Sequence, residues 1–255
     1  MREALEQEAR VLAGLPPGIP APALVGSAAV GEWRVLVLAV IDGHQPGQPW
    51  TPAEVEAVRG ACTAIAGLAT PAPAGLAPRS VVEDIGGDER VVAVGAALAA
   101  GRFDVPGGMP SWPLRRQREV GALVLAAGGR LGGETLTHGD LRPDNILVDA
   151  AGTAWVLDWN WVRRGPAWMD LVGLLPMMWW HGIDTGSLVR DCVLTRDADP
   201  EAVDSFLACI VAYMVSALDR PPPPGCTPAL REHQRLMAHL FLGFLGARRG
   251  WARKR

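Results

Sequence analysis

Residues 3–15 have the period of an amphipathic helix, with one charged residue on the apolar side. At 100° per residue, the apolar side chains share one arc that contains Ala4, Leu5, Val11, Leu12 and Leu15. Glu8 falls near the middle of this arc, whereas most other charged side chains of the segment lie on the opposite side. A buried carboxylate requires a cation or several hydrogen-bond donors. We therefore expect Glu8 to have a partner within the fold, and Arg34 is one candidate.

A strand and then a series of helices follow along the chain. The apolar, β-branched run at 33–41 predicts a strand, and a helix is predicted at 52–68. Thr51 and Glu54 have the spacing of a capping box at the start of that helix. Further helices are predicted near 91–100, 114–128, 169–180, 201–218 and 228–246. The pattern indicates an α+β protein with a small N-terminal part, a linker and a mainly helical larger part.

The composition excludes several classes of protein. With 255 residues, 49% of them hydrophobic and 20% charged, the chain can form one or two globular lobes. A net charge of −3 gives no global positive field, so we expect no nucleic-acid partner. The first residues lack a secretory pattern, and the apolar run at 206–218 is too short to cross a bilayer. We therefore expect a cytoplasmic protein with no membrane partner, whose oligomeric state the sequence does not indicate.

Two further features have broad interpretations. The four cysteines are far apart in sequence and form no metal-binding pair, which is typical of buried free thiols in a reducing compartment. The acidic residues between Asp191 and Asp204 are interpreted as a solvated helix entrance. Alternatively, they attract a cationic substrate.

The region 136–170 contains the residues with the clearest chemical pattern. His138, Asp140 and Asn145 form an HxDxxxxN motif, and two short strands at 146–149 and 154–157 flank a turn. If Asp149 faces Ala154 in this hairpin, Asn145 faces Asp158. Opposed residues lie about 5 Å apart, close enough for an amide oxygen and a carboxylate to share a divalent cation.

These residue types match the requirements of phosphoryl transfer. Such a reaction needs a carboxylate that orients and deprotonates the acceptor hydroxyl, and oxygen ligands that hold magnesium against the phosphates. Asp140 suits the first role, and Asn145 and Asp158 suit the second. His138 is interpreted as a residue that fixes the loop. The alternatives are a metal hydrolase, for which HxD alone is equally suitable, and a hairpin whose polar residues only form turns.

The letters HGDLRPDN, followed by an Asp thirteen residues after the Asn, resemble the catalytic and metal-binding loops of the protein kinase-like superfamily. The region is more closely similar to the aminoglycoside phosphotransferase family, because it has Gly139 within HGD, Leu-Asp-Trp at 157–159 and Gly-Pro-Ala-Trp-Met-Asp-Leu from Gly165. The resemblance implies a two-lobe kinase-like fold with a truncated N-terminal lobe at 1–43 and a helical C-terminal lobe at 44–255.

The same resemblance implies an activity and a role for each site residue. The activity is transfer of the γ-phosphate of ATP to a hydroxyl of a small molecule, with Mg²⁺ as cofactor. Asp140 would be the base, Arg142 would neutralise the transferring phosphate, and Asn145 and Asp158 would bind the metal. The resemblance also implies residues that contact the nucleotide and residues that support the catalytic loop. Glu8, Ala39 and Ile41 would contact the nucleotide, and His138 and Asp170 would support the loop.

One part of the family pattern is missing. Family members begin with a glycine-containing strand pair and a lysine that pairs with the helix glutamate, whereas the only lysine of this sequence is Lys254. We expect that the chain begins inside a longer gene product; the other explanation is a reduced protein. The second explanation corresponds to a non-catalytic ligand-binding or interaction module.

Overall fold

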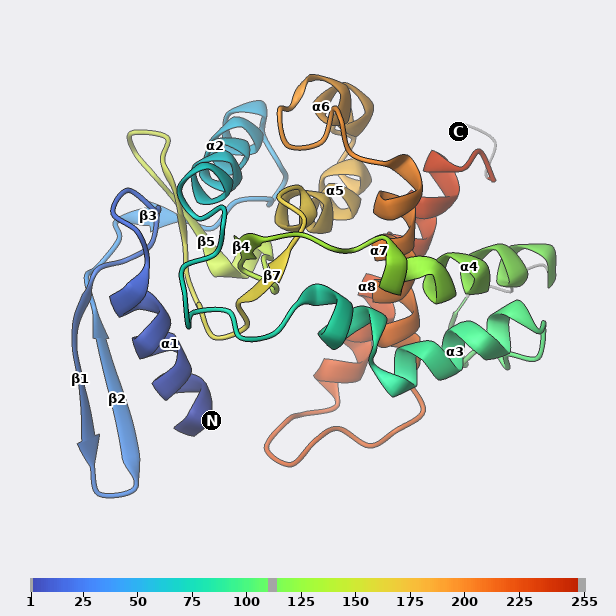
Figure 1. Ribbon diagram of the computed structural model, residues 1–255, viewed down its shortest axis with the longest axis horizontal. Coiled ribbons are helices and arrows are strands. Elements are labelled where there is room, and N and C mark those ends of the chain that lie inside the picture. The colour runs from blue at the N-terminus through green and yellow to red at the C-terminus, as the bar shows by residue number, and fades with distance from the viewer. Residues whose placement is uncertain (1, 110–113, 252–255) are drawn as a thin grey trace. The chain divides into compact units, whose positions relative to one another are not determined.

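The chain passes back and forth between two compact units. The computed structural model describes residues 2–109 and 114–251 (Figure 1). The first unit consists of Met1–Ser80 and Gly133–Asp197, and the second consists of Val81–Gly132 and Ala198–Arg255. The predicted division into lobes at 1–43 and 44–255 places its boundary inside the first of these units and stays a prediction.

The first unit begins with a helix that packs on a two-stranded sheet. Helix α1 (Arg2–Gly14) contacts the antiparallel strands β1 (Leu24–Val30) and β2 (Trp33–Leu38). Trp33, Val35 and Val37 alternate on one face of β2, and all three are exposed. The sequence did not predict β1, because its residues include small side chains without an apolar and polar alternation.

The rest of the first unit surrounds two small sheets with helices. Its first sheet has the order β3 (Gly43–His44), β5 (Ile146–Asp149) and β6 (Ala154–Val156), and its second pairs β4 (Thr135–Thr137) with β7 (Arg163–Gly165). The helices of this part are α2 (Pro52–Leu68), α5 (Met169–Trp180) and α6 (Thr185–Asp191). Because α2 packs against β4, β6 and α5, it forms a support beneath the loop that follows β4.

The predicted capping box at the start of α2 is confirmed. The Thr51 hydroxyl accepts a hydrogen bond from the Glu54 amide at 3.3 Å, and the Glu54 carboxylate accepts one from the Thr51 amide at 2.8 Å. The same carboxylate lies 3.1 Å from Nε2 of His44 in β3. The box therefore joins the start of α2 to the sheet that carries the predicted metal ligands.

The second unit is helical. It contains α3 (Glu89–Ala99), α4 (Leu114–Ala126), α7 (Pro200–Val215) and α8 (Ala229–Arg248), together with the short helical turns η1 (Val82–Gly86) and η2 (Ala127–Gly129). Helix α3 packs against α4, and α7 contacts α3, α4 and α8. A Cβ atom at Gly121 would lie 2.2 Å from the Ala99 amide nitrogen, so glycine is required where α3 and α4 meet.

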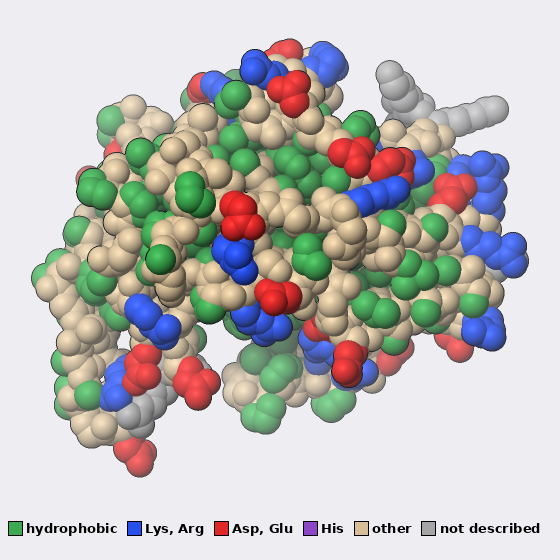
Figure 2. Space-filling model, viewed as in Figure 1, with side chains coloured by type: hydrophobic (Ala, Val, Ile, Leu, Met, Phe, Trp, Pro, Cys, Tyr) green, Lys and Arg blue, Asp and Glu red, His purple; other side chains and the backbone are tan. Residues whose placement is uncertain are grey.

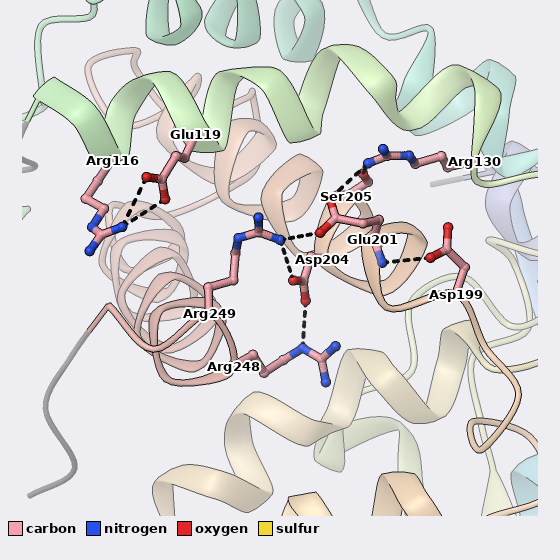
Figure 3. A network of polar contacts seen from close by, with 9 residues as sticks. All are labelled: Arg116, Glu119, Arg130, Asp199, Glu201, Asp204, Ser205, Arg248 and Arg249. Carbon is pink, nitrogen blue, oxygen red and sulfur yellow. Dashed lines mark hydrogen bonds and ion pairs between the residues drawn. The ribbon is translucent and has the colours of Figure 1, made fainter.

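Arginine side chains pair with the acidic residues at the start of α7 (Figure 3). Asp204 is buried and accepts hydrogen bonds from Nε of Arg248 at 2.7 Å and from Arg249 at 2.9 Å. Arg249 also bonds Glu201 at 2.8 Å, while Asp199 caps α7 by accepting from the Glu201 amide at 3.0 Å. The interpretation of this segment as a solvated entrance is therefore wrong for Asp204, which is an internal anchor for the end of α8.

Charged side chains of both signs lie at the surface (Figure 2), and three of the four cysteines are buried. On the face seen in Figure 2, most acidic side chains lie beside basic ones. Within the described ranges, no helix has both the length and the apolar character needed to span a membrane. Cys62, Cys192 and Cys209 are buried free thiols as predicted, but Cys226 is exposed.

Candidate functional site

The loop after β4 is held by hydrogen bonds from both of its sides. The backbone amides of His138 and Gly139 donate to the two carboxylate oxygens of Asp170, at 2.7 and 3.1 Å. The His138 ring is fully buried, and its Nε2 lies 2.8 Å from the Leu157 carbonyl oxygen. These bonds tie the loop of Asp140 to the start of α5 and to the end of the β5–β6 hairpin, and the loop-supporting roles of His138 and Asp170 stay a prediction.

Burial sets the protonation of both supporting residues. It lowers the pKa of His138 to about 4, so the ring is neutral at pH 7 and Nε2 donates its proton to the carbonyl oxygen. Burial raises the pKa of Asp170 to about 6, although the two backbone amides and Arg163 oppose the rise. A fully buried ring with so low a pKa accepts a proton poorly at pH 7, so His138 is unsuited to the role of general base.

Gly139 allows the loop to pass close to the segment after Asp158. Its φ is +80°, and a Cβ atom there would lie 2.3 Å from the Trp161 carbonyl oxygen. Any side chain at this position would require both a left-handed backbone and a displacement of that segment. Backbone conformation and steric contact together therefore explain why glycine occupies the middle position of the HGD motif.

Asp140 has a raised pKa and a nearby cation. Burial raises the pKa of its carboxyl group to about 6, and the negative charges of Asp144 and Asp158 add to this rise. The Arg142 guanidinium lies 3.9 Å from the Asp140 carboxylate and lowers the pKa, but the same guanidinium forms its shorter bonds with Asp144, at 2.9 and 3.1 Å. A carboxyl group with this pKa is mostly ionised at pH 7 and remains a usable base.

The predicted register of the hairpin is wrong by one residue. Val148, not Asp149, pairs with Ala154, and the Leu157 amide donates to the Asn145 carbonyl at 2.9 Å. Asn145 therefore faces Leu157, and Asp158 lies one residue beyond the paired strands. Asp158 has a φ of +62°, which turns the chain away from the strand direction at this point.

Asn145 is attached to the loop that carries Asp140. Its side-chain Nδ2 donates to the Asp140 carbonyl oxygen at 2.9 Å. The amide oxygen of Asn145 is not used in this bond and is left for another partner. A backbone turn at Pro143–Asn145 (η3) produces this approach, because it follows directly on Arg142.

Glu8 lies beside the same turn of the chain. It is only 7% exposed, and its pKa is raised by burial first and by the charge of Asp158 second. The backbone amides of Trp159 and Asp158 bond to the carboxylate and oppose the rise. Arg34, the candidate cation for Glu8, bonds Glu6 at 2.6 Å instead. The partners of the buried Glu8 carboxylate are therefore these two backbone amides, and no cationic side chain in the described part of the chain bonds to it.

The segment after β2 contains the two predicted nucleotide-contacting positions. The Ala39 amide donates to the Ala23 carbonyl at 2.9 Å, so this amide is already hydrogen-bonded within the chain. Ala39 and Ile41 are both half-buried. Their assignment as adenine contacts stays a prediction.

Two further residues of the site were not predicted from the sequence. Asn160 donates from Nδ2 to Oδ1 of Asp158 at 2.6 Å. Arg163 lowers the pKa of Asp140, Asp170 and His138 through its positive charge. One signal for Asn160 was available, because the whole sequence contains only two asparagines, Asn145 and Asn160. Arg163 had no such signal among many arginines.

The site offers oxygen ligands that are suitable for magnesium. Among the described residues, no group of three histidine, cysteine, aspartate or glutamate side chains is placed to hold a metal ion. The predicted pair is of another kind, an asparagine oxygen with a carboxylate, and both are hard ligands of the type that Mg²⁺ prefers. The chemistry of Asn145 and Asp158 therefore fits Mg²⁺ with nucleotide phosphates as additional ligands.

Comparison with known proteins identifies the class to which this fold and site belong. The small sheets, the many helices and the helical C-terminal part match the protein kinase-like fold of aminoglycoside phosphotransferases. The sequence profile of the phosphotransferase enzyme family matches residues 2–206. The chain belongs to this phosphotransferase family. No curated protein is significantly similar to it in sequence.

Solved structures share the fold at low sequence identity. An aminoglycoside phosphotransferase from Alicyclobacillus acidocaldarius is 15% identical, with a TM-score of 0.54 over 98% of this chain and 82% of that one. A thermostable mutant of the aminoglycoside phosphotransferase APH(4)-Ia in its apo form is 14% identical, with a TM-score of 0.58 over 98% and 85% of the two chains. A ternary complex of that enzyme with ADP and hygromycin B is 14% identical, with a TM-score of 0.58 over 98% and 84%.

Proposed function

We propose that the protein transfers the γ-phosphate of ATP to a hydroxyl group of a small molecule. The observation that carries this proposal is the placement of Asp140. It lies on a loop fixed by Asp170 and His138, it is joined to Asn145 through its own carbonyl, and its pKa responds to the charge of Asp158. These contacts support the assignment of Asp140 as the base and of Asn145 and Asp158 as the oxygen ligands that phosphoryl transfer needs.

Each residue has a definite part in the proposed reaction. The Asp140 carboxylate accepts the proton of the acceptor hydroxyl as the hydroxyl oxygen bonds to the γ-phosphorus. The bond between that phosphorus and the bridging oxygen breaks, and ADP leaves with the electron pair. Arg142 is near enough to offset negative charge on the transferred group. Asn145 and Asp158 would hold Mg²⁺, which when bound neutralises phosphate charge.

The nucleotide part of the proposal has support from the relatives. The fold is shared with an enzyme whose ternary complex contains ADP and hygromycin B. A related complex of the same enzyme contains AMP-PNP and hygromycin B, with 12% identity and a TM-score of 0.57. The acceptor of this chain is a separate question, because related scaffolds with the same fold act on different molecules.

Thermal unfolding with and without MgATP tests the proposal. We expect millimolar MgATP to raise the midpoint of the intact chain, because a ligand that binds only the folded state stabilises it by RT ln(1 + [L]/Kd). The rise should be lost in Asp158→Ala and kept in Asp140→Asn. With an acceptor found by screening hydroxyl compounds, Asp140→Asn should lower turnover by about 10²–10⁴-fold.

Two results would contradict the proposal. The first is a folded wild-type protein with no MgATP-dependent rise, and the second is full turnover in Asp140→Asn. Asp197→Asn is the control, since the Asp197 side chain is 85% exposed and pairs only with the neighbouring Arg196 in the described structure. It should keep the MgATP-dependent rise and most of the turnover.

The second candidate function is a non-catalytic ligand-binding module. The observation that favours it is that the buried Glu8 bonds to backbone amides and that the sequence has no lysine except Lys254, whereas the family resemblance implies a lysine partner for this glutamate. In that case MgATP-dependent stabilisation can occur, but no acceptor is phosphorylated above the level of Asp140→Asn.

A further inference from the structure

Asparagine occurs at only two positions of this protein: Asn145 is one proposed metal ligand, and Asn160 is hydrogen-bonded to the other, Asp158. The 255 residues include Asn145 and Asn160 and no other asparagine. Asn145 is attached to the loop of Asp140, and Asn160 is bonded to Asp158. A composition that uses asparagine so sparingly makes its presence two positions after Asp158 a feature that requires an explanation.

The bond between Asn160 and Asp158 has a fixed direction. Nδ2 of Asn160 lies 2.6 Å from Oδ1 of Asp158. An ionised carboxylate only accepts hydrogen bonds, so the amide nitrogen must face it, and the amide oxygen must point elsewhere. That oxygen is buried and has no hydrogen-bond partner among the described residues. In the orientation that lets Asn160 donate to Asp158, its own amide oxygen therefore has no hydrogen-bond donor.

The backbone around Asp158 requires such support. Asp158 is the one non-glycine residue with positive φ in the described part of the chain, and a left-handed backbone costs about 1–2 kcal/mol in a residue with a Cβ atom. Trp159 anchors the next residue, because its indole nitrogen donates to the Val156 carbonyl at 2.8 Å and its ring is fully buried against His138. The Glu8 carboxylate accepts hydrogen bonds from the backbone amides of Asp158 and Trp159.

These contacts hold the backbone, but only Asn160 holds the carboxylate. Among the described residues, the Asn160 amide is the one group with a hydrogen bond to the Asp158 side chain. Rotation about the side-chain bonds of an aspartate is otherwise restricted only by packing. With Oδ1 held by Asn160, Oδ2 accepts no hydrogen bond from a described residue and is open to a cation.

We propose that Asn160 is a positioning residue that orients the Asp158 carboxylate for Mg²⁺. This inference rests on the proposed function, because it assigns a role within the same site. It extends that function by adding a residue that does not touch the metal or the substrate and acts through Asp158. Partners that orient a metal ligand in this way are commonly worth 10–100-fold in metal affinity.

The test compares Asn160→Leu with Asn160→Gln in the full chain. Leucine has a similar size and no donor, whereas glutamine keeps the amide. We expect Asn160→Leu to raise the Mg²⁺ concentration needed for half of the ATP-dependent thermal shift by about tenfold, with the full shift recovered at high Mg²⁺. Asn160→Gln should recover at least part of the wild-type affinity. Thr63→Val, which removes a side-chain hydrogen bond on α2, should leave the Mg²⁺ dependence unchanged.

A second measurement uses the metal without nucleotide. Mn²⁺ binding, followed by electron paramagnetic resonance, should be weakened in Asn160→Leu by a similar factor. If Asn160→Leu lowers the thermal stability but leaves both metal titrations at their wild-type values, Asn160 is merely structural and the inference is overturned. If the wild-type chain binds neither Mn²⁺ nor MgATP, the proposed function itself fails and the inference fails with it.

Discussion

Gly139 and Gly152 are two glycines with almost the same backbone conformation and different surroundings. Their φ angles are +80° and +81°, but a Cβ atom at Gly139 would meet the Trp161 carbonyl oxygen at 2.3 Å, whereas nothing lies within 4 Å of one at Gly152. We expect Gly152→Ala to cost about 1 kcal/mol of unfolding free energy, for the left-handed backbone alone. Gly139→Ala should cost clearly more and also abolish MgATP binding.

Denaturant unfolding of the two variants measures this difference directly. The comparison removes the backbone term, because it is shared. Equal losses of stability in the two variants would show that the segment at Trp161 moves freely, and the loop of Asp140 would then have no fixed position relative to Asp158.

The raised pKa of Asp140 predicts a pH dependence of the reaction. Its pKa of about 6 lies above the usual 3.8, so the carboxylate that accepts a proton is present only as the pH rises through 6. We expect kcat/KM to increase between pH 5 and 7 and then to level off, since this ratio reports the free enzyme. A profile that is flat from pH 5 to 8 would contradict the role of Asp140 as base.

The raised pKa of Asp140 also makes the free energy of unfolding depend on pH, and this quantity falls over the pH range in which the activity rises. The folded protein binds this proton more tightly than the unfolded chain does, because the folded-state pKa is the higher one. Deprotonation of Asp140 as the pH rises from 4 through 6 therefore lowers the stability while it raises the activity. A group that works against stability in this way is typical of a functional site.

At the scale of secondary-structure elements, one buried acid, Asp204, joins the start of α7 to the end of α8. Asp204 is 4% exposed and binds two arginines at the end of α8 (Figure 3). Asp204→Ala would leave both guanidinium groups partly buried without their shared partner. We expect a loss of about 2–3 kcal/mol of unfolding free energy, below the range for fully buried pairs.

Asp197 supplies the control for this prediction. Its side chain is 85% exposed and pairs only with the neighbouring Arg196 in the described structure. Asp197→Ala should change the stability by well under 1 kcal/mol, as is usual for exposed ion pairs. Hydrogen exchange should locate the loss in Asp204→Ala at the ends of α7 and α8. Wild-type hydrogen exchange and unfolding free energy in Asp204→Ala would contradict the prediction. They would show that water replaces Asp204 as the hydrogen-bond partner of the two arginines at no cost.

The elements that the sequence predicted well are those with local signals. The capping box of Thr51 and Glu54 and the period of α1 depend on residues within one or two turns, and both were found. Strands β4 and β7 were missed because each has three residues and its partner lies 26–30 positions away. The hairpin register was displaced by one residue because nothing in the local pattern marks Asp158 as the place where the chain turns.

The candidate site shows the same boundary between local and tertiary information. The motif spacing was sufficient to select Asp140, Asn145 and Asp158 as candidates, and the arc of α1 was sufficient to predict that Glu8 is buried. The donors to Glu8 could not be predicted, because they are backbone amides from a segment 150 residues away and carry no side-chain signature. The roles of these residues stay proposals until the variants are measured.

At the scale of the whole molecule, the two units are interleaved along the chain. The first unit is complete only when Asp197 has been added, and the second contains helices from before and after residues 133–197. The family match at 2–206 likewise ends shortly after α7 begins. Neither unit is therefore a contiguous stretch that can be expressed by cutting the gene once.

This order has a consequence for synthesis on the ribosome. Helices α3 and α4 are made early, but α7, which packs on both, follows only after residues 133–197 have been added. At roughly 5–20 residues per second, translation of that segment takes on the order of several seconds. Leu98 and Val124, buried in the finished protein, belong to helices that lack α7 during this interval. We therefore expect the apolar faces of α3 and α4 to lack their cover by α7 for seconds during synthesis, an interval in which exposed apolar surface favours aggregation.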